Sequence, residues 1–305
     1  MKNPKIVVVG SSNTDMVLKV PRIPAPGESV IGGDFFIIPG GKGANQAVAA
    51  ARAGAQVTFL ACVGDDDFGT QAIENYQNDD IDTSFIKVKD GVSSGVAMIN
   101  VSEDGENSIT VAPGANNHLY PDDVSRRIVA FRDADMVLVQ LEMPMETVEA
   151  VAQTANSLNI PLILNPAPAA FLSNELLQMV SVITPNETEA ALLTGRKGYD
   201  DLDIPAMATE LYEKGVKTVI ITLGKKGVFL KNADHKEYIP GFVVKAVDTT
   251  AAGDVFNGTL AAALASNISL REAIDFAQRA AAISVTRMGA QPSAPRLGEI
   301  EGFDI

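Results

Sequence analysis

From residue 56 onward, short strand-like runs alternate with helical patterns, and this alternation constrains the fold more than any other feature of the sequence. The strand-like runs are residues 56–61, 136–140, 161–164, 180–184 and 218–222. Helical patterns lie between most of them, including residues 145–158 and 204–214. Together with a β-branched run at residues 5–10, this order predicts an α/β fold with helices on both faces of a parallel sheet.

Polar residues follow several of these runs, at the points where the strands would end. They are Asn13 and Asp15 after the first run, and Gln140, Glu142, Asn165, Thr184, Asn186, Thr222 and Gly224 after later runs. The carboxyl ends of parallel strands meet at one edge of a sheet, which is where open α/β sheets bind ligands. We therefore predict a binding cleft along this edge.

Two segments contain strand-like runs with no helical pattern between them. The first has runs at residues 16–20, 29–31 and 35–38, and the second has runs at 95–101 and 107–111. Both predict antiparallel hairpins that form a small separate sheet. Such a sheet is suited to act as a lid, and an apolar face on it to pair with another subunit.

A strand–turn–helix pattern at residues 242–264 is the strongest candidate for a reactive site. An extended run, 242–247, is followed by the small residues Ala251, Ala252 and Gly253, and Asp254 then opens an apolar helix. Unpaired N–H groups at a helix start attract anions, by about 0.3–1 kcal/mol from the helix dipole. A carboxylate beside such a phosphate site suits a general base, which contributes about 10²–10⁴-fold in rate.

Purely structural explanations compete with a functional one at three places. Thr249 or Thr250 can cap the helix that Asp254 opens. Asn186 with Glu189 forms the pattern of a capping box. Residues 222–227 lie between two strand-like runs, where a hairpin turn and a nucleotide-binding loop are both possible.

A glycine-rich turn, residues 39–45, precedes an alanine-rich helical pattern at 46–52. It lacks the Gly-Lys-Ser/Thr of a Walker A loop and the third glycine of a dinucleotide fingerprint. Lys42 and Asn45 would face the same helix start, and the glycines would let a polar ligand reach the backbone.

Composition excludes several classes of function. The 305 residues include 24 Lys and Arg and 38 Asp and Glu, so the net charge of 24 − 38 = −14 argues against nucleic-acid and anionic-membrane partners. His118, His235 and the single cysteine, Cys62, offer neither a zinc site nor a Ser/His/Asp set. We predict that Cys62 is a buried core thiol. No signal peptide and no apolar run of about 18 residues is visible, so we expect a cytoplasmic protein.

Five motifs carry a resemblance to a known family. They are residues 40–47 (Gly-Gly-Lys-Gly-Ala-Asn-Gln-Ala), 165–168 (Asn-Pro-Ala-Pro), 184–189 (Thr-Pro-Asn-Glu-Thr-Glu), 248–254 (Asp-Thr-Thr-Ala-Ala-Gly-Asp) and 289–293 (Gly-Ala-Gln-Pro-Ser). The chain resembles the ribokinase family of carbohydrate kinases from Asn13 to about Pro295. The resemblance implies one three-layer α/β/α domain, residues 1–305, with a lid at about 15–39 and 94–112. It also implies a homodimer joined through the lid, and ATP-dependent phosphorylation of the 5-hydroxyl of D-ribose.

The resemblance also implies roles for individual residues. Asp254 would be the base, and Ala251, Ala252 and Gly253 would form the anion hole. The sugar would be bound by Asn13, Thr14, Asp15, Gly41, Lys42, Gly43, Asn45 and Glu142, together with Asp254. The nucleotide would be bound by Asn186, Thr222, Leu223, Gly224, Lys225, Gly227, Gly253 and Gln278; the family often has His or Asn at the last position. Glu189 would help place Mg²⁺ through water, and a monovalent cation, K⁺, would lie among Asp248, Thr250, Ser284, Arg287, Gly289 and Ser293, several of them binding through backbone carbonyls.

Other functions remain open on the sequence alone. A nucleoside kinase should have apolar residues around its sugar, and the polar set above argues against one. A kinase for 2-deoxyribose, a ketose or another small sugar is harder to exclude, because deoxyribose lacks only one hydroxyl. A non-catalytic sugar-binding protein would not need Asp254, and a nicotinamide oxidoreductase would need the missing glycine fingerprint.

Overall fold

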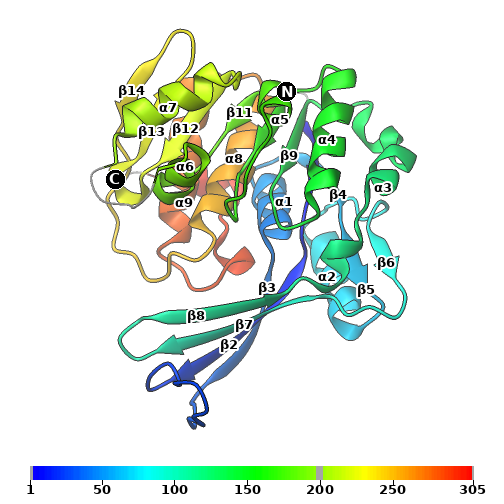
Figure 1. Ribbon diagram of the computed structural model, residues 1–305, viewed down its shortest axis with the longest axis vertical. Helices are drawn as coiled ribbons and strands as arrows, with labels where there is room; N and C mark the ends of the chain where they lie inside the picture. The colour runs from blue at the N-terminus through cyan, green and yellow to red at the C-terminus, as the bar shows by residue number, and fades with distance from the viewer. Residues whose placement is uncertain (1–2, 197–201, 304–305) are drawn as a thin grey trace.

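A computed structural model describes residues 3–196 and 202–303. The predicted domain of residues 1–305 also includes 1–2, 197–201 and 304–305, which lie outside the described residues. The main body contains an eight-stranded sheet (Figure 1). In spatial order its strands are β14 (Lys236–Ile239), β13 (Val228–Lys231), β12 (Thr218–Thr222), β11 (Val182–Ile183), β10 (Leu162–Leu164), β9 (Met136–Val139), β1 (Lys5–Val9) and β4 (Gln56–Leu60). The strands from β12 to β4 are parallel, and β13 and β14 add an antiparallel hairpin.

Helices pack on both faces of this sheet, as the sequence predicts. The helices on one face include α1 (Lys42–Arg52), α8 (Ala252–Ala265) and α9 (Leu270–Ser284); those on the other include α4 (Met145–Ser157), α5 (Asn174–Met179) and α7 (Ile204–Glu213). Alternation along β1 shows why the sheet is buried on both sides: Ile6 and Val8 belong to the first core cluster, and Val7 and Val9 to the second. The α/β/α prediction is confirmed. The remaining helices are α2 (Asp67–Asn78), α3 (Pro121–Arg126), α6 (Glu187–Leu193) and α10 (Leu297–Glu301).

A second sheet of four strands projects from the body (Figure 1). Its order is β3 (Phe35–Gly40), β2 (Asn13–Val20), β7 (Gly95–Ser102) and β8 (Asn107–Ala112). The pairs β2–β3 and β7–β8 are antiparallel, and β2 joins β7 in parallel. The sequence did not predict this parallel pair, because it depends on two segments about 80 residues apart. A further pair, β5 (Cys62–Gly64) with β6 (Lys87–Lys89), is also parallel.

Two predicted strands are wrong. Residues 29–31 pair with no strand, and Ile31 is 94 % exposed. The chain returns to β2 only at residues 33–34, where Gly33 N donates to Lys19 O and Lys19 N donates to Asp34 O. Residues 242–247 are also outside any strand. The ladder with β13 ends at Ile239, and Phe242, Val244 and Ala246 line a cavity instead.

Smaller predictions hold with shifted bounds. The helix expected at 46–52 begins at Lys42, and the long helix expected at 270–286 ends at Ser284. Cys62 is a buried free thiol, as predicted. In the parts of the chain that the structure describes, no helix is both long enough and apolar enough to cross a membrane.

Candidate active site

Glu142 joins the end of β9 to the start of α1. Its Oε2 accepts hydrogen bonds from Ser11 Oγ at 2.6 Å and from Lys42 N at 3.0 Å. The Ser11 hydroxyl in turn accepts from Gly43 N at 3.2 Å. The carboxylate and the hydroxyl therefore satisfy two N–H groups that a helix start leaves unpaired. Three residues predicted to bind sugar, Lys42, Gly43 and Glu142, lie together as a result.

Asp254 lies in the first turn of α8 and is 6 % exposed. Its Oδ2 accepts from Asn45 Nδ2 at 2.9 Å, and its Oδ1 accepts from Gln46 Nε2 at 2.9 Å. Burial raises the pKa of the Asp254 carboxyl, against the opposing effects of Lys42 and the two amides. Among the described residues, Asn45 Oδ1 is buried without a hydrogen-bond partner. That acceptor is available to a ligand hydroxyl next to the carboxylate.

The Lys42 ammonium group lies among four carboxylates, those of Asp15, Glu142, Glu189 and Asp254. Burial lowers the pKa of Lys42, but these carboxylates outweigh burial and raise it. Burial, Glu142 and Asp254 raise the pKa of Asp15 to about 6, although Lys42 opposes them. Burial also raises the pKa of Glu189. Residues far apart in sequence thus share one strongly coupled electrostatic site.

Asn13 is held by a residue that the sequence did not single out. Asn116 Nδ2 donates to Asn13 Oδ1 at 2.7 Å, and Asn116 Oδ1 accepts from Ser12 N at 2.9 Å. The Asn13 amide therefore has its oxygen turned toward Asn116 and its NH₂ group free for another partner. Asn13 and Thr14 line a small cavity of about 110 Å³ beside α2.

The start of α8 has the form expected of an anion site. Ala251 is the N-cap, with φ of 58°, and no side chain caps the helix, so the capping role considered for Thr249 or Thr250 is wrong. Within residues 3–196 and 202–303, neither Gly253 N nor Asp254 N donates to an acceptor. A Cβ added at Gly253 would meet no atom within 4 Å. These N–H groups are open to a ligand.

A cavity of about 420 Å³ adjoins this helix start. Thr222, Gly224, Lys225, Gly227, Ala252, Gly253 and Gln278 line it, with apolar residues that include Phe242, Val244, Phe256 and Val285. Gln278 Nε2 donates to Pro240 O at 3.3 Å, and its buried Oε1 has no partner in the described chain. The turn at 222–227 is therefore both a hairpin turn and a wall of this cavity.

Asn186 and Leu223 do not line this cavity. Asn186 Oδ1 accepts from Glu189 N and Glu189 Oε2 accepts from Asn186 N, both at 2.8 Å, so the predicted capping box is confirmed. Asn186 also forms a bridge to Thr222, which brings it beside the cavity rim. Leu223 is buried, with 6 % of its surface exposed.

Hydrogen bonds join three of the residues proposed for a monovalent cation, Asp248, Thr250 and Gly289, just before the start of α8. Asp248 Oδ1 accepts from Thr250 N and its Oδ2 accepts from Gly289 N, both at 2.9 Å. The buried Ser293 hydroxyl donates to Ala290 O at 2.7 Å, which leaves its oxygen lone pairs free. The Arg287 guanidinium pairs with Glu299, so only its backbone can join this set. Carboxylate, hydroxyl and carbonyl oxygens are the donors that hard cations prefer. The described residues contain no group of three or more His, Cys, Asp or Glu side chains placed to bind a metal ion.

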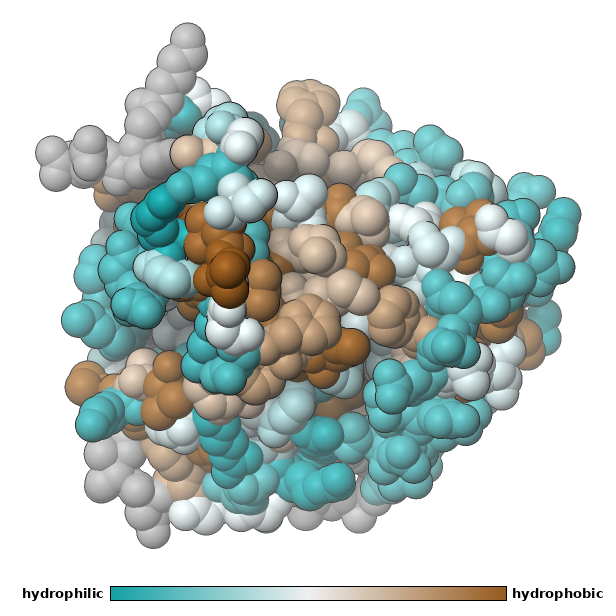
Figure 2. Space-filling model, turned by 90° about the horizontal axis from the view of Figure 1, so that it is seen from below, coloured by the Kyte–Doolittle hydropathy of each residue, from teal (hydrophilic) through white to brown (hydrophobic). Residues whose placement is uncertain are grey.

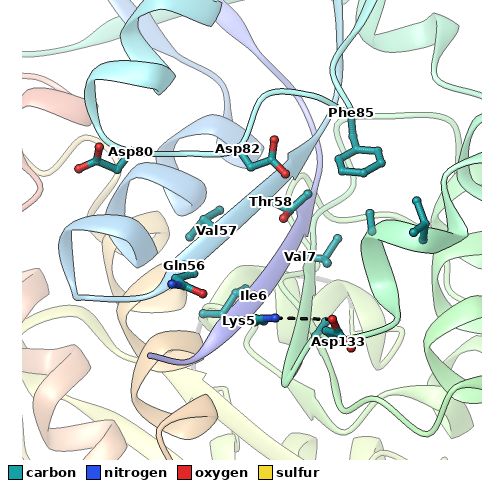
Figure 3. A pocket seen from close by; sticks show the side chains of 13 residues that line it. Lys5, Ile6, Val7, Gln56, Val57, Thr58, Asp80, Asp82, Phe85 and Asp133 are labelled. Atoms are coloured by element: carbon teal, nitrogen blue, oxygen red, sulfur yellow. Dashed lines mark ion pairs between the residues drawn. The ribbon is translucent and has the colours of Figure 1, made fainter. Parts of the chain in front are cut away.

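Another cavity, of about 450 Å³, lies at the opposite edge of the sheet (Figure 3). Lys5 and Gln56, at the amino ends of β1 and β4, line it together with Asp80, Asp82 and Asp133. The Lys5 ammonium is 3.6 Å from the Asp133 carboxylate. None of the predicted site residues lines it, so it is not the candidate active site.

Two buried residues of the site, Gln46 and Asn116, were not singled out by the sequence reasoning. Gln140 and Asn165 were predicted to lie along the cleft edge but were given no individual role. Gln46 and Asn165 belong to two of the quoted motifs, so the sequence did contain a signal for them. Nothing in the local sequence distinguishes Asn116.

Comparisons with known proteins show which family the chain resembles and which fold it shares. The pfkB family carbohydrate kinase profile matches residues 3–297. The ribokinase of Haemophilus influenzae is 47 % identical over 298 residues, which cover 98 % of this chain and 97 % of that protein. The deoxyribokinase of Salmonella typhi is 37 % identical over 300 residues, with 98 % of both chains covered. The structure of Arabidopsis thaliana ribokinase complexed with ribose and ATP superposes with a TM-score of 0.91, at 30 % identity and full coverage of both chains.

Proposed function

Because this chain belongs to the pfkB family of carbohydrate kinases, we propose that it transfers the γ-phosphoryl group of ATP to the 5-hydroxyl of D-ribose, giving D-ribose 5-phosphate and ADP. The observation that carries the proposal is the position of Asp254. Its carboxylate faces the sugar-side residues of α1, and the preceding residue, Gly253, lines the adjoining cavity. A base at this junction can reach a hydroxyl on one side and a phosphate on the other.

In the proposed reaction, Asp254 removes the proton of the 5-hydroxyl as its oxygen attacks the γ-phosphorus. The bond from the γ-phosphorus to the bridging oxygen breaks, ADP leaves, and Asp254 later releases the proton to solvent. The free N–H groups of Gly253 and Asp254 stabilise charge on the transferring group. Asn45 holds one oxygen of the base and offers its own unpaired Oδ1 to the sugar.

On the sugar side, we propose that Asn13, Asp15, Lys42 and Glu142 bind ribose hydroxyls. Thr14, Gly41 and Gly43 contribute through the backbone next to them. The four-stranded sheet, which begins at Asn13, would act as the lid that excludes water from the reaction.

On the nucleotide side, we propose that the cavity lined by Gly224, Gly227 and Gln278 holds the adenosine of ATP. Lys225 offers the phosphates a positive charge, and Asn186 and Leu223 support the rim. Because Mg²⁺ usually keeps several waters, Glu189 can hold it through water without a carboxylate cluster. When bound, the ion neutralises charge on the phosphates.

We propose a K⁺ site formed by the Asp248 carboxylate, the Ser293 hydroxyl and backbone carbonyls near Thr250, Ser284, Arg287 and Gly289. The oxygen donors described above fit such an ion. Asp248 hydrogen-bonds both loops, and the loop that contains Thr250 leads directly into Ala251 and Gly253. The bound cation would supply a positive charge that stabilises these loops around the start of α8.

We also propose a homodimer formed through the four-stranded sheet, in the cytoplasm, where ATP is supplied. Figure 2 shows hydrophobic residues gathered across the middle of the face seen from below, the side toward which this sheet projects. The strand register aligns Phe36, Val17, Ile99 and Ile109 in one row across the sheet. Phe36 is 42 % and Ile109 56 % exposed, which is typical of an interface face.

The dimer is tested by sedimentation of Ile109→Glu. We expect the wild type to sediment as a dimer and this variant as a monomer, because a buried charge in the row destabilises the interface. Thr110→Glu adds the same charge on the opposite face of β8 and should leave the dimer intact. A monomeric wild type would refute the dimer.

A kinase for 2-deoxyribose is the second candidate, favoured by the identity with a deoxyribokinase. ADP release measured with Mg-ATP against a panel of sugars, each with and without K⁺, separates the two. We expect the highest kcat/KM on D-ribose, and a rise with K⁺. Higher activity on 2-deoxyribose would change the substrate and keep the mechanism, and no turnover on any sugar would reject the kinase.

A further inference from the structure

Three buried amides form a row beside Asp254. Gln140 Nε2 donates to Gln46 Oε1 at 2.6 Å, and Gln46 Nε2 donates both to Asp254 Oδ1 at 2.9 Å and to Asn165 Oδ1 at 3.0 Å. Asn165 Nδ2 then donates to Thr184 O at 3.2 Å. Gln46 and Gln140 are fully buried. The row crosses from the end of β9 through α1 to the ends of β10 and β11.

The direction of these amides follows from their partners. Thr184 O can only accept a hydrogen bond, so the Asn165 NH₂ group faces it and the Asn165 oxygen faces Gln46. In the ionised form that acts as the base, the Asp254 carboxylate also only accepts. Gln46 is therefore held with both hydrogens of its NH₂ group in use, one on each acceptor. A backbone carbonyl at a strand end thus sets the orientation of the donor that Asp254 receives.

We propose that Gln46 is the positioning residue of the base: it fixes the orientation of the Asp254 carboxylate and keeps it ionised, without touching the sugar itself. This inference rests on the proposed function, because it assigns a supporting residue to the base of that reaction. Asn45 Nδ2 donates to the other carboxylate oxygen, but Asn45 Oδ1 is unpaired and available to the sugar. A substitution of Asn45 would therefore affect both sugar binding and the position of the carboxylate. Both polar atoms of the Gln46 side chain already have protein partners and the side chain is fully buried, so its contribution is separable from ligand binding.

Besides the neutral Gln46 amide, several charged groups act on Asp254. Lys42 on α1 favours its ionised form, while Glu142 after β9, Asp15 on β2 and Glu189 on α6 disfavour it. Removing the Gln46 donor takes a hydrogen bond from the ionised form and must raise the pKa of Asp254. A base with a raised pKa stays protonated to a higher pH, so activity is lost first on the acidic side.

The test is the pH dependence of kcat in Gln46→Met, which keeps the side-chain length without a donor. We expect kcat to fall on the order of 10–10²-fold at about pH 6 and to recover toward the wild-type value at about pH 9, with the sugar KM changed less than about 3-fold. Gln46→Glu should show a larger loss, because it adds a like charge beside the base. Gln153→Glu on the exposed face of α4 makes the same chemical change and should leave the profile unchanged.

A loss of kcat that is equal at every pH, or an unchanged acidic limb in Gln46→Met, would overturn the inference. Circular dichroism checks that each variant folds, and if Gln46→Glu does not fold, Gln46→Met alone decides. A second readout needs no turnover: the ¹³C shift of the Asp254 carboxyl, identified by its absence in Asp254→Asn, should titrate at higher pH in Gln46→Met. If the wild type phosphorylates no sugar, the proposed function fails, and this titration still decides whether Gln46 keeps Asp254 ionised.

Discussion

The two sides of the cleft are built differently. On the side proposed to bind sugar (the sugar side), charged and amide side chains of β2, α1 and the β9 loop hold one another, as Glu142 holds Lys42 N and Asn45 holds Asp254. On the side proposed to bind ATP (the nucleotide side), apolar side chains such as Phe242 and Val285 line the cavity together with glycines. The first side is suited to recognising each hydroxyl group of a sugar by a hydrogen bond. The second side is suited to enclosing a flat adenine ring and to presenting backbone N–H groups to phosphate.

The difference implies that substitutions on one side should leave binding on the other side intact. Gly253 and Asp254 form the junction between the two sides, and Glu189 is coupled electrostatically to Lys42 and Asp254 across it. In the proposed function, polar side chains bind the ligand with many hydroxyl groups, and backbone N–H groups bind the phosphates of the charged ligand. The experiments below test this division.

Asp254→Asn should have the largest effect, because it removes the base and leaves the shape of the cleft. We expect kcat to fall about 10³-fold, within the range for general base catalysis, while ribose and a non-hydrolysable ATP analogue still bind. Coupled ADP release and calorimetry measure the two properties. A kcat close to that of the wild type would contradict the role of Asp254 as the base. Loss of binding of both ribose and the ATP analogue would mean that the residue is structural.

Gly253→Val should damage the nucleotide side alone. A Cβ added at this position meets no atom within 4 Å, so we expect the valine side chain to extend into the space proposed for phosphate. We expect kcat/KM for ATP to fall on the order of 10²-fold, comparable to losing a donor to the transferring group, with ribose affinity unchanged. Gly298→Val is a matched control, since that glycine also lies in the first turn of a helix and has equally open surroundings. Similar losses in both variants would contradict the prediction.

Asp15 should give the sugar side a pH dependence that the nucleotide side lacks. Its pKa of about 6 means that protonation below this pH removes a charged acceptor, so the KM for ribose should rise as pH falls while the KM for ATP stays flat. Asp15→Asn should raise the ribose KM roughly 10–100-fold and abolish this dependence. Asp34→Asn, on the exposed approach to β3, should do neither. If the KM for ATP changed with pH in the same way as the KM for ribose, the two sides would not be independent.

Ala251→Gly should have the smallest effect. A non-glycine residue at φ of 58° carries a steric cost of about 1–2 kcal/mol, and glycine loses about 0.5–1 kcal/mol in chain entropy on folding. We therefore expect the free energy of unfolding in urea to rise by up to about 1 kcal/mol. Ala150→Gly in the middle of α4 should lower it by about 1 kcal/mol. A decrease in both variants would show that Ala251 is not strained.

Both sheets show what local sequence can and cannot predict. The alternation of patterns was enough for the α/β fold, because buried parallel strands are apolar on both faces. The four-stranded sheet was predicted as two hairpins, and its parallel β2–β7 pair was not. Residues 242–247 were expected to form a strand because the run is extended and β-branched, but they lie outside any strand, and alternate residues, Phe242, Val244 and Ala246, line the cavity proposed for the nucleotide. A cavity wall and a strand have similar composition, so composition alone does not separate them.

The sequence by itself determined the fold class, the edge of the sheet that carries the site and the identity of Asp254 as the candidate base. These depend on local periodicity, on strand ends and on a short motif. Only the tertiary structure decided how Gln46, Gln140 and Asn165 join Asp254, and how Asn116 orients Asn13. Hydrogen bonds between buried amides depend on the packing of α1 against α8 and on strand order, and these place residues 46, 165 and 254 together.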